Sequence, residues 1–506
     1  MKKLKIFFVQ PINNETLAMD MLGQQSRAFG YLKAYLDKYL DFKDIEYKVI
    51  QNVNELEKEK CDILAVSAYS QYFYHANKII EKARELYPDL FIILGGHHIT
   101  LVPSSLPDEV DAGVIGEGEE TFLDLISLYL KKSSVKELKK ELHNIKGIIF
   151  KDNESPKGAP VSINSGASPG PKKLGFTPTG YYDTNKKLVM TEPRPLIEPL
   201  DKIPFFDKML SSSWKIDMDI RQTKIYNYIF ASRGCPFNCS FCSAKITSNG
   251  RYREFSTTYI INEIEQILEI LPDVTDIIIS DETFGSNKKR LQQIIEQAEK
   301  KQINKKLSFN ASIRSDLVDE EFCELLKRLN VKTVLIGAES MSARILNLLK
   351  QGVTPQDNER ACKLLTKYGI ESSYSMIFGT PSETEEDLKL SFDFILNNIR
   401  SGDLSSVCIA ILTPLPGTYW WTYAKEQGWV DENNMNWTKL DNIFMSCIPS
   451  GVKTYQEWRD ERENYAIYLN KYTIPERRFY DLLGQFNKKF TDAMFSKARW
   501  KGQDSI

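Results

Sequence analysis

Three cysteines on one short stretch are the residues with the clearest chemical potential in this sequence. Cys235, Cys239 and Cys242 stand with three and then two residues between them, directly after an apolar, strand-like run. Three thiolates on one loop can hold three irons of a [4Fe-4S] cluster and leave the fourth iron without a protein ligand. An open coordination position on a metal is a place where a substrate or cofactor can bind. The spacing therefore predicts an iron–sulfur site with one free position.

Two other metal sites fit the cysteine loop less well. A structural zinc site needs a fourth Cys or His close by, and no histidine lies within ninety residues of the loop. Electron-transfer clusters usually have four cysteine ligands, and no fourth cysteine is near. The remaining cysteines are scattered through helix and strand patterns, as is typical of buried hydrophobes: Cys61, Cys323, Cys362, Cys408 and Cys447. We therefore expect a cytoplasmic metalloprotein rather than a disulfide framework.

The composition limits the number of domains and the kinds of partner. A chain of 506 residues predicts two or three domains. Its 66 Lys and Arg balance 68 Asp and Glu, so we expect neither nucleic acid nor an acidic membrane surface as a partner. The apolar runs, such as residues 90–94, are too short to span a bilayer. Residues 1–9 lack the apolar core of a signal peptide and are expected to form a first strand.

The first 140 residues alternate between strand and helix patterns. Strands are predicted at 5–10, 47–50, 62–67, 91–94 and 112–115, with helices at 29–40, 76–86 and 120–130. This alternation predicts a doubly wound parallel sheet of the flavodoxin or Rossmann type, in which ligands bind beyond the carboxyl ends of the strands. The strands here end in polar or glycine-bearing stretches at 67–70, 95–98 and 116–119. Acidic residues after Gly116 and Gly118 argue against a dinucleotide.

The rest of the chain predicts a linker, a second α/β domain and an extension. Residues 141–220 form the expected linker, which is rich in Gly, Pro and Ser and includes a hairpin arm at 186–190 and a crossing at 193–206. Residues 221–428 contain six β/α units, which predict a partial (β/α)6 barrel with its chemistry at the carboxyl ends of the strands. Residues 429–506 are aromatic-rich, and we expect a mainly helical extension, mildly basic over its last thirty residues.

The cysteine spacing after the first barrel strand resembles that of the radical S-adenosylmethionine (SAM) superfamily. Phe241 stands before the last cysteine, where that family usually has an aromatic residue. The resemblance implies that the amino and carboxylate groups of SAM chelate the fourth iron. It also implies that one electron, from an external donor such as flavodoxin or ferredoxin, cleaves the sulfonium and releases a 5′-deoxyadenosyl radical. The cofactors carry this chemistry and the protein positions them.

The other strand ends contain residues that this resemblance assigns to SAM. Asp281 and Glu282 stand where the family binds the methionine ammonium. Arg314 could pair with the SAM carboxylate, because its planar guanidinium matches a carboxylate. Glu339 could accept from a ribose hydroxyl or the ammonium, and Gly379 lies in the turn that approaches adenine in the family. Each charged residue alone could equally form a surface ion pair, but together they predict a pocket.

The first domain, followed by this barrel, resembles the cobalamin-binding class of radical SAM enzymes. The stretches 95–100 and 114–122 carry the resemblance. It implies that residues around 10–30 and Glu117 face the corrin, and that the cobalamin contacts are Ser67, Tyr69, Gly95, Gly96, His97, Gly116, Glu117 and Gly118. Other cobalamin folds place Asp-x-His-x-x-Gly after strand one, and residues 10–30 contain no histidine. Many members of this class also lack that motif. His97 and His98 are expected to be fold or corrin-edge contacts rather than cobalt ligands.

The function that these features predict is a radical methyltransferase. It would abstract a hydrogen from an unactivated centre of a small-molecule or peptide substrate, with methylcobalamin as the methyl donor. One alternative is an enzyme with the same cofactors that catalyses a rearrangement, ring contraction or cyclisation. Another is a non-catalytic sensor that binds cobalamin and a cluster. Trp420 and Trp421 could line a substrate pocket, but buried packing is the expected role of both.

Overall fold

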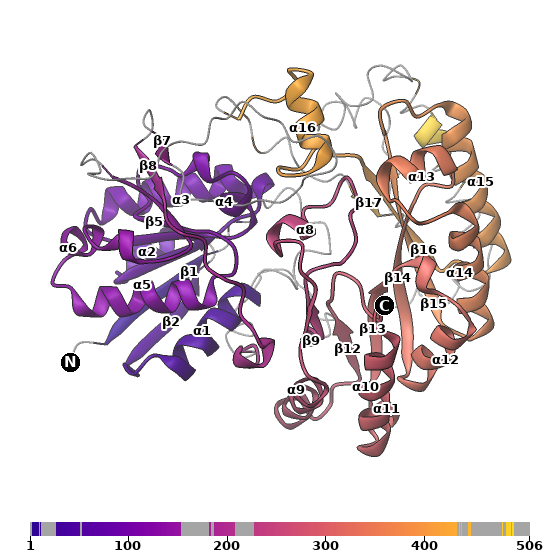
Figure 1. Ribbon diagram of the computed structural model, residues 1–506, viewed down its shortest axis with the longest axis horizontal. Coiled ribbons are helices and arrows are strands. Elements are labelled where there is room, and N and C mark those ends of the chain that lie inside the picture. Colours follow the sequence, from indigo (N-terminus) through magenta and orange to yellow (C-terminus); the bar gives the residue numbers. More distant parts are fainter. Residues whose placement is uncertain are drawn as a thin grey trace. The chain divides into compact units, whose positions relative to one another are not determined.

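The computed structural model describes residues 3–9, 11, 27–50, 53–152, 182–183, 187–207, 227–432, 435, 437, 444–446, 478, 482–486 and 488–489 (Figure 1). The chain divides into two compact units. The first unit contains residues 1–222 with the short segments 246–250 and 431–438. The second unit contains residues 223–245, 251–430 and 439–506.

The first unit is built on a parallel sheet with the strand order of flavodoxin. Its parallel strands, from the edge inward, are β2 (Ile45–Ile50), β1 (Leu4–Val9), β3 (Ile63–Ser67), β4 (Phe91–Gly95) and β5 (Ala112–Val114). The order along the sheet reverses between β1 and β3, which is the point where doubly wound sheets bind ligands. The predicted doubly wound domain is confirmed, with strand boundaries within two residues of those expected.

Three antiparallel strands extend this sheet beyond β5. They are β6 (Ile148–Lys151), β8 (Leu188–Met190) and β7 (Tyr182–Asp183). The segment 141–220 was predicted to be a linker outside the first domain, and the structure differs, because β6 and β8 complete the first sheet. Ile148 and Ile149 are fully buried, so β6 belongs to the core. The predicted hairpin arm at 186–190 is β8, paired with β7. Residues 153–181 lie outside the described residues.

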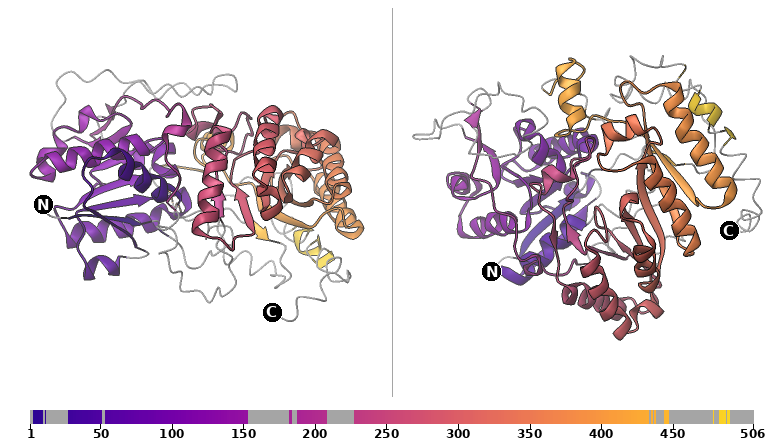
Figure 2. Two further views of the ribbon diagram at one scale, coloured as in Figure 1. Left: turned by 90° about the horizontal axis from the view of Figure 1, so that it is seen from below. Right: turned by 45° about the vertical axis from the view of Figure 1, so that its right-hand side comes forward.

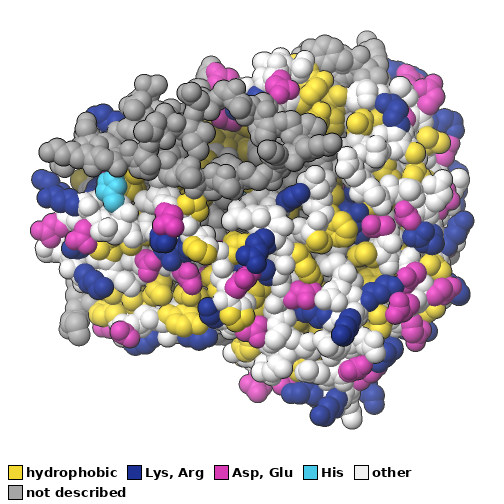
Figure 3. Space-filling view, viewed as in Figure 1, with side chains coloured by type: hydrophobic (Ala, Val, Ile, Leu, Met, Phe, Trp, Pro, Cys, Tyr) yellow, Lys and Arg dark blue, Asp and Glu magenta, His cyan; other side chains and the backbone are white. Residues whose placement is uncertain are grey.

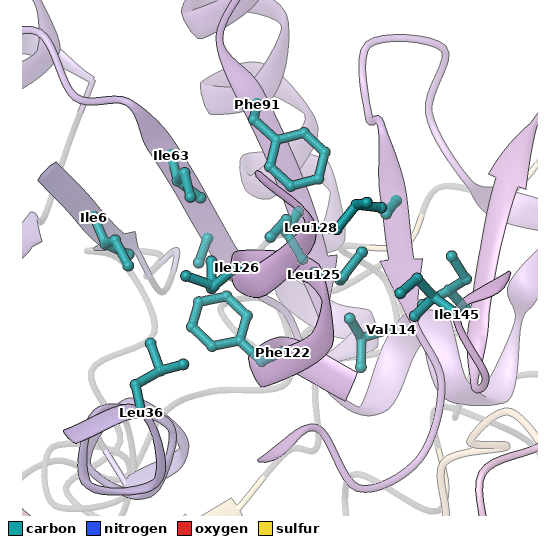
Figure 4. Close-up of a cluster of buried hydrophobic side chains, with 14 of the residues drawn as sticks. Ile6, Leu36, Ile63, Phe91, Val114, Phe122, Leu125, Ile126, Leu128 and Ile145 are labelled. Atoms are coloured by element: carbon teal, nitrogen blue, oxygen red, sulfur yellow. The ribbon is translucent and has the colours of Figure 1, made fainter. Parts of the chain in front are cut away.

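Helices pack on the first sheet, and those of one face bury a large apolar cluster against it. The helices are α1 (Arg27–Tyr39), α2 (Asn54–Lys58), α3 (Phe73–Leu86), α4 (His97–Leu101), α5 (Glu119–Lys131) and α6 (Val135–Lys139). Ile6 and Ile63 from the strands meet Leu36 of α1 and Phe122 of α5 in one cluster (Figure 4). Burying such side chains contributes about 1.5–3 kcal/mol each before entropy is subtracted. This core fixes the strand ends at which a ligand would bind.

The second unit is the predicted partial barrel. Six parallel strands lie in chain order: β9 (Asn227–Ile229), β12 (Asp276–Ile279), β13 (Ser308–Ile313), β14 (Val331–Glu339), β15 (Glu371–Phe378) and β16 (Ser406–Ile411). A seventh, β17 (Phe444–Ser446), pairs antiparallel with β16. Among the described strands, β9 and β17 form the two edges of the sheet and do not pair, so the barrel is open.

The helices that follow the barrel strands cover the outer face of this sheet (Figures 1 and 2). They are α9 (Thr257–Ile270), α10 (Lys288–Lys300), α11 (Ile303–Lys306), α12 (Glu320–Arg328), α13 (Ala343–Leu349), α14 (Pro355–Lys367) and α15 (Glu385–Ser401). The next helix, α16 (Tyr419–Glu426), lies apart from this layer (Figure 1). Side-chain caps, which accept a backbone N–H of the first helical turn, define several of their starts: Ser256, Asn287, Asp319, Thr354 and Thr384.

The C-terminal extension is described only at a few positions. Trp437 packs edge-on against His98 within the first unit, with ring centroids 4.5 Å apart. Arg478 forms a two-pronged ion pair with Glu385, at 2.8 and 2.6 Å. Most of the aromatic and basic residues predicted for this extension, between 447 and 477 and beyond 490, lie outside the described residues. None of the helices described is long and apolar enough to cross a membrane. Basic and acidic side chains alternate over the face shown in Figure 3.

Candidate active site

The three cysteines lie on the loop between the first barrel strand and α8 (Ala244–Thr247), and all three are partly exposed. Burial raises the pKa of the Cys242 thiol to about 12, and it also raises the pKa of Cys239. Iron must therefore displace thiol protons when it binds. Among the described residues no three acidic, Cys or His side chains converge on a single metal ion. A cubane fits the loop nonetheless, because its cysteine ligands bind separate irons.

Ser240, in the middle of the loop, ties it to two helices of the barrel. Its N–H donates to the carbonyl of Leu349 at the end of α13, at 2.9 Å, and its hydroxyl donates to Leu348 at 2.8 Å. From α16, the Trp420 indole N–H donates to the Ser240 hydroxyl at 2.9 Å, and the Tyr419 N–H donates to the Ser240 carbonyl. These bonds fix the loop between Cys239 and Cys242 before any cluster is present.

A carboxylate and a guanidinium fix the beginning of the loop. Asp281 Oδ1 accepts from the backbone N–H groups of Ala231 and Ser232, at 2.7 and 3.1 Å, and Oδ2 accepts from the Ser232 hydroxyl at 2.6 Å. Arg290 donates to the carbonyl of Ala231 at 2.6 Å. We call these contacts the Asp281 clamp. Next to it, β10 (Ser232–Arg233) pairs antiparallel with β11 (Arg253–Glu254) and closes the base of the loop.

The two acidic residues predicted to contact SAM have different surroundings. Asp281 is buried and both of its oxygens are occupied within the clamp. Glu282 is exposed, and its charge helps to raise the pKa of Cys242 after burial, the larger cause. The hydroxyl of Thr283 lies 3.7 Å from the sulfur of Cys235. Of the pair, Glu282 is therefore the carboxylate that faces the loop.

Arg314 brings a positive charge to the cysteine loop. One of its N–H groups lies 3.8 Å from the sulfur of Cys239, and the guanidinium lies over the ring of Phe237, 3.6 Å from the ring centroid. Its other donors bind both oxygens of Asp316, at 2.9 and 3.1 Å. The side chain is almost fully buried. Asp316 thus fixes the orientation of Arg314, whose predicted pairing with the SAM carboxylate stays a prediction.

Glu339 is held in a buried ion pair at a bulge of the sheet. Its carboxylate lies 3.3 Å from the ammonium of Lys350, which also donates to the carbonyl of Gly337. Glu339 has a positive φ of 61°, which is costly for a residue with a side chain, and strain of this kind gathers at functional sites. Burial raises its pKa, while Lys350 and Arg314 oppose that rise. Its predicted contact with SAM would have to compete with Lys350.

The turn after β15 is organised by a carboxyl group that the sequence did not single out. Glu383 is fully buried, and its Oε2 accepts from the N–H groups of Gly379 and Thr380, at 2.6 and 3.2 Å. Its other oxygen and the Thr380 hydroxyl are buried with no hydrogen-bond partner among the described residues. Burial raises the pKa of Glu383 to about 8. Gly379, with φ of 84°, is therefore held in place by Glu383 beneath it.

This raised pKa predicts a pH dependence of stability. The unfolded chain loses the Glu383 proton near its ordinary pKa of 4.5, whereas the folded protein keeps it to about 8. The stabilisation is thus complete below pH 4.5 and is lost as pH rises towards 8, by up to about 1.4 kcal/mol per pH unit. Glu383→Gln cannot ionise and should remove this slope. Urea unfolding between pH 5 and pH 9, with exposed Glu386→Gln as control, checks this prediction. Parallel curves of stability against pH for Glu383→Gln and the parent would contradict it.

The aromatic residues near the loop have packing roles. Trp420 and Trp421 are buried, as expected, and Trp420 packs with Ile345 and Leu412. Phe241 lies partly buried against the same cluster. The predicted contact of Phe241 with SAM therefore stays a prediction.

In the first unit, the predicted cobalamin residues gather at the carboxyl edge of the sheet. Ser67 and Gly95 are paired at the ends of β3 and β4, and Gly116 follows β5. Ser67 is partly exposed, and Gly116 is exposed with open space where a side chain would stand. Tyr69 lies obliquely against the exposed ring of His97, with centroids 4.8 Å apart. Open space with hydroxyl and amide groups suits a bulky polar cofactor.

Two of the expected contacts have partners within the domain itself. Glu117 accepts from the backbone N–H of Ile197 in the crossing segment, at 3.2 Å. Gly118 is the N-cap of α5 and lies close to Leu32. Of the segment 10–30 predicted to face the corrin, residues 10 and 12–26 lie outside the described residues.

His98 is a buried residue whose contacts lie within the first unit, as expected of a fold contact. Its two ring nitrogens lie 3.0 Å from the Ser70 hydroxyl and 2.9 Å from that of Ser105. The ring stacks on Phe73 at 3.7 Å. Burial lowers the pKa of His98 to about 3, so the ring is neutral and joins the ends of β3 and β4.

Alanine substitutions at Gly96 and Gly116 test the backbone geometry at the carboxyl edge of the first sheet. Gly96 has φ of 99° and ψ of −175°, a region essentially restricted to glycine. A Cβ there would lie 2.8 Å from the backbone N and O of Ala68. Gly96→Ala should therefore destabilise the protein by more than about 3 kcal/mol. The Cβ of Gly116→Ala would meet no atom within 4 Å. Only the positive φ of 80° should therefore destabilise this variant, by about 1–2 kcal/mol. Equal melting temperatures for the two variants would contradict this difference.

Comparison with known proteins agrees with both units. Residues 15–126 match the B12 binding domain and residues 229–395 match the radical SAM superfamily. An uncharacterized methyltransferase of Pyrococcus horikoshii is 29% identical over 88% of this chain and 87% of its own length. The anaerobic magnesium-protoporphyrin IX monomethyl ester cyclase of Rubrivivax gelatinosus is 26% identical over 77% of this chain, which spans 65% of that protein.

A solved structure shares the arrangement of both domains along the chain. It is the radical SAM methyltransferase TsrM from Kitasatospora setae with cobalamin and a [4Fe-4S] cluster bound, which matches with a TM-score of 0.60 and 18% identity over 84% of this chain and 78% of that one. At this identity the likeness shows the fold. The cofactors that the two domains imply are a [4Fe-4S] cluster, SAM and cobalamin. The chain therefore contains a B12-binding domain followed by a radical SAM domain, and it is an enzyme.

Proposed function

We propose that this enzyme is a cobalamin-dependent radical methyltransferase that methylates an unactivated centre of a small-molecule or peptide substrate. The observation that carries the proposal is the similarity to the Pyrococcus methyltransferase, which runs through 88% of the chain and so includes both cofactor domains. The cysteine loop supports it independently, because three partly exposed thiols on one anchored loop leave a position on the cluster for SAM.

The proposal gives the residues around the loop distinct roles. Cys235, Cys239 and Cys242 hold the cluster, and Arg314 places a positive charge beside the sulfur of Cys239. Glu282 is exposed next to the loop and is the acceptor that we assign to the SAM ammonium. The backbone at Gly379, fixed by Glu383, is the surface that we assign to the adenine. Ser67 and Gly95, with the neighbouring glycines, would hold cobalamin.

The side chains of the protein position the cofactors, and the cofactors supply the reactive groups. When bound, the cluster and SAM supply a 5′-deoxyadenosyl radical, and cobalamin supplies the methyl group. The described side chains near the loop are mostly engaged with one another: Asp316 holds Arg314, Lys350 holds Glu339, and Asp281 holds the loop base. Preorganised contacts of this kind keep a site in one geometry during reaction.

Product mass tests the proposal. The reconstituted enzyme is incubated anaerobically with reductant, cobalamin and SAM carrying a deuterated methyl group, together with candidate small molecules and peptides. A product heavier by one deuterated methyl group supports methyl transfer. Turnover that repeatedly yields products without the label would instead support a rearrangement or cyclisation, the reaction class that the similarity to the Rubrivivax cyclase favours.

Formation of 5′-deoxyadenosine separates an enzyme from a sensor. Protein with an intact cluster that releases no 5′-deoxyadenosine with dithionite and candidate substrates would contradict the radical reaction. We further propose a one-electron donor such as flavodoxin or ferredoxin as the physiological partner. A cytoplasmic location is proposed because Cys61, Cys323 and Cys362 are free and buried rather than joined in disulfides.

A further inference from the structure

The strands of the partial barrel have two faces of opposite character. Along β13, β15 and β16, residues alternate strictly between buried and partly or fully exposed positions over most of each strand. The buried set faces the outer helices, as shown by Tyr374, whose hydroxyl donates to the carbonyl of Asn358 on α14 at 2.7 Å. Because side chains alternate between the two faces of a strand, the other set points away from the helices, into the barrel.

The inward-pointing set is rich in small polar residues. It includes Asn310, Ser312, Thr333, Ser373, Ser375 and Cys408, beside the apolar residues Ile278, Leu335 and Ala410. The register brings these residues together, because Asn310 pairs with Thr333, and Ser375 pairs with Cys408. In closed barrels of this type, Val, Ile and Leu fill the same positions and pack them solid. Here Leu335, between Ser312 and Ser373 in the register, is 42% exposed, so the inside is not packed.

Most of these polar groups have no partner within the protein. Ser373 accepts a hydrogen bond from Ser406 at 2.8 Å. In the described part of the chain, the side chains of Asn310, Ser312, Thr333 and Ser375 make no hydrogen bond to protein. A bound molecule that lacks hydrogen-bonding groups would remove water from these side chains and leave them unpaired, at a cost of about tenfold in affinity for each.

We propose that this inner face binds the polar part of the substrate through Ser312, Ser373 and Ser375, and that the substrate is rich in hydroxyl or amide groups rather than a hydrocarbon lipid. This proposal rests on the proposed function for the reaction that the substrate undergoes. The binding of the substrate to the inner face does not depend on that reaction. The same strands lead directly to the candidate site: Ser375 is followed in β15 by Ile377, against whose cluster Phe241 of the cysteine loop packs. A substrate held by the serines would thus extend towards the cysteine loop.

Two probes of opposite character test the inner face of the full-length reconstituted enzyme. Erythritol, a small polyol, is followed by saturation-transfer NMR, and xenon, an apolar atom, by its chemical shift. The parent should bind erythritol and take up no xenon in the barrel. The triple variant Ser312→Ala, Ser373→Ala, Ser375→Ala should bind erythritol at least tenfold more weakly and take up xenon. Ser401→Ala, at the exposed end of α15, should behave as the parent.

Every other result overturns the proposal: xenon but not erythritol in the parent, neither probe in the parent, or unchanged erythritol binding in the triple variant. Where the triple variant fails to fold, the single variants Ser375→Ala and Ser375→Thr test the proposal. Threonine keeps the hydroxyl and should retain erythritol binding, whereas alanine should lose it. These binding results do not depend on methyl transfer. Failure of the proposed reaction would therefore appear in product mass alone, and failure of this inference in probe binding alone.

Discussion

Alanine in place of any one of Cys235, Cys239 and Cys242 is expected to abolish the [4Fe-4S] cluster and, with it, all cleavage of SAM. The expected loss is complete rather than partial, because the cluster has only these three protein ligands and the next cysteine in the chain, Cys323, is buried in α12. Burial also raises the pKa of Cys239 and Cys242, which disfavours free thiolates at these two positions. Iron and sulfide content, with the visible spectrum of the anaerobic protein, measures the loss.

The fold should survive these cysteine substitutions. Ser240 anchors the loop to α13 and α16, and the Asp281 clamp holds its base, without any cluster. Far-ultraviolet circular dichroism should therefore match that of the parent. Cys323→Ala is the matched control, since this cysteine is buried in α12 of the same unit and should keep a full cluster. A single-cysteine variant that retains stoichiometric iron and cleaves SAM would show that the ligands lie elsewhere.

The order of strands and helices could be predicted from sequence because each element follows a local pattern. The parallel strands of the first sheet lie within two residues of their predicted bounds, and the second unit contains the six parallel strands predicted for residues 221–428. The three antiparallel strands of the first sheet could not be predicted in the same way. Their pairing depends on contacts between residues far apart in the chain, such as Gly113 with Ile149, and the intervening Gly- and Pro-rich composition favoured a linker instead.

The candidate site shows the same division between local and long-range information. The cysteine spacing is a local signal and identified the loop. The partners of the charged strand-end residues come from distant parts of the sequence, so Lys350 beside Glu339 and Arg290 beside Ala231 were not foreseen. Glu383 is an exception, because it lies only four residues after Gly379. A turn glycine followed by an acidic residue is, however, too common a pattern to indicate a buried carboxyl by itself.

Asp281 shows most clearly how these partners change the interpretation of a residue. Its position at the end of β12 predicted a contact with the SAM ammonium. In the structure both oxygens accept from Ala231 and Ser232, and the group is buried. Burial raises the pKa of Asp281 to about 6, in opposition to these hydrogen bonds. A carboxylate so enclosed serves to position the backbone from which the cysteine loop departs.

Positioning of the loop backbone and binding of the SAM ammonium predict opposite behaviour for Asp281→Asn. Asparagine can keep the contacts of the clamp, since its carbonyl accepts from the two N–H groups and its amide donates to the Ser232 hydroxyl. If Asp281 is a positioning residue, Asp281→Asn should retain the cluster and bind SAM within a factor of about three of the parent. Asp281→Ala leaves two buried N–H groups unpaired, at about 1–3 kcal/mol each, and should load little iron.

If Asp281 instead binds the SAM ammonium, Asp281→Asn should weaken that binding, because the asparagine amide lacks the charge that attracts the ammonium. Asp281→Asn would then keep its cluster and lose SAM affinity by tenfold or more. Iron content and the effect of SAM on the electron paramagnetic resonance signal of the reduced cluster separate the two cases. Glu282→Gln is the matched comparison: its carboxylate is exposed beside Cys242, so the charge-dependent loss of SAM affinity should appear there and not at Asp281.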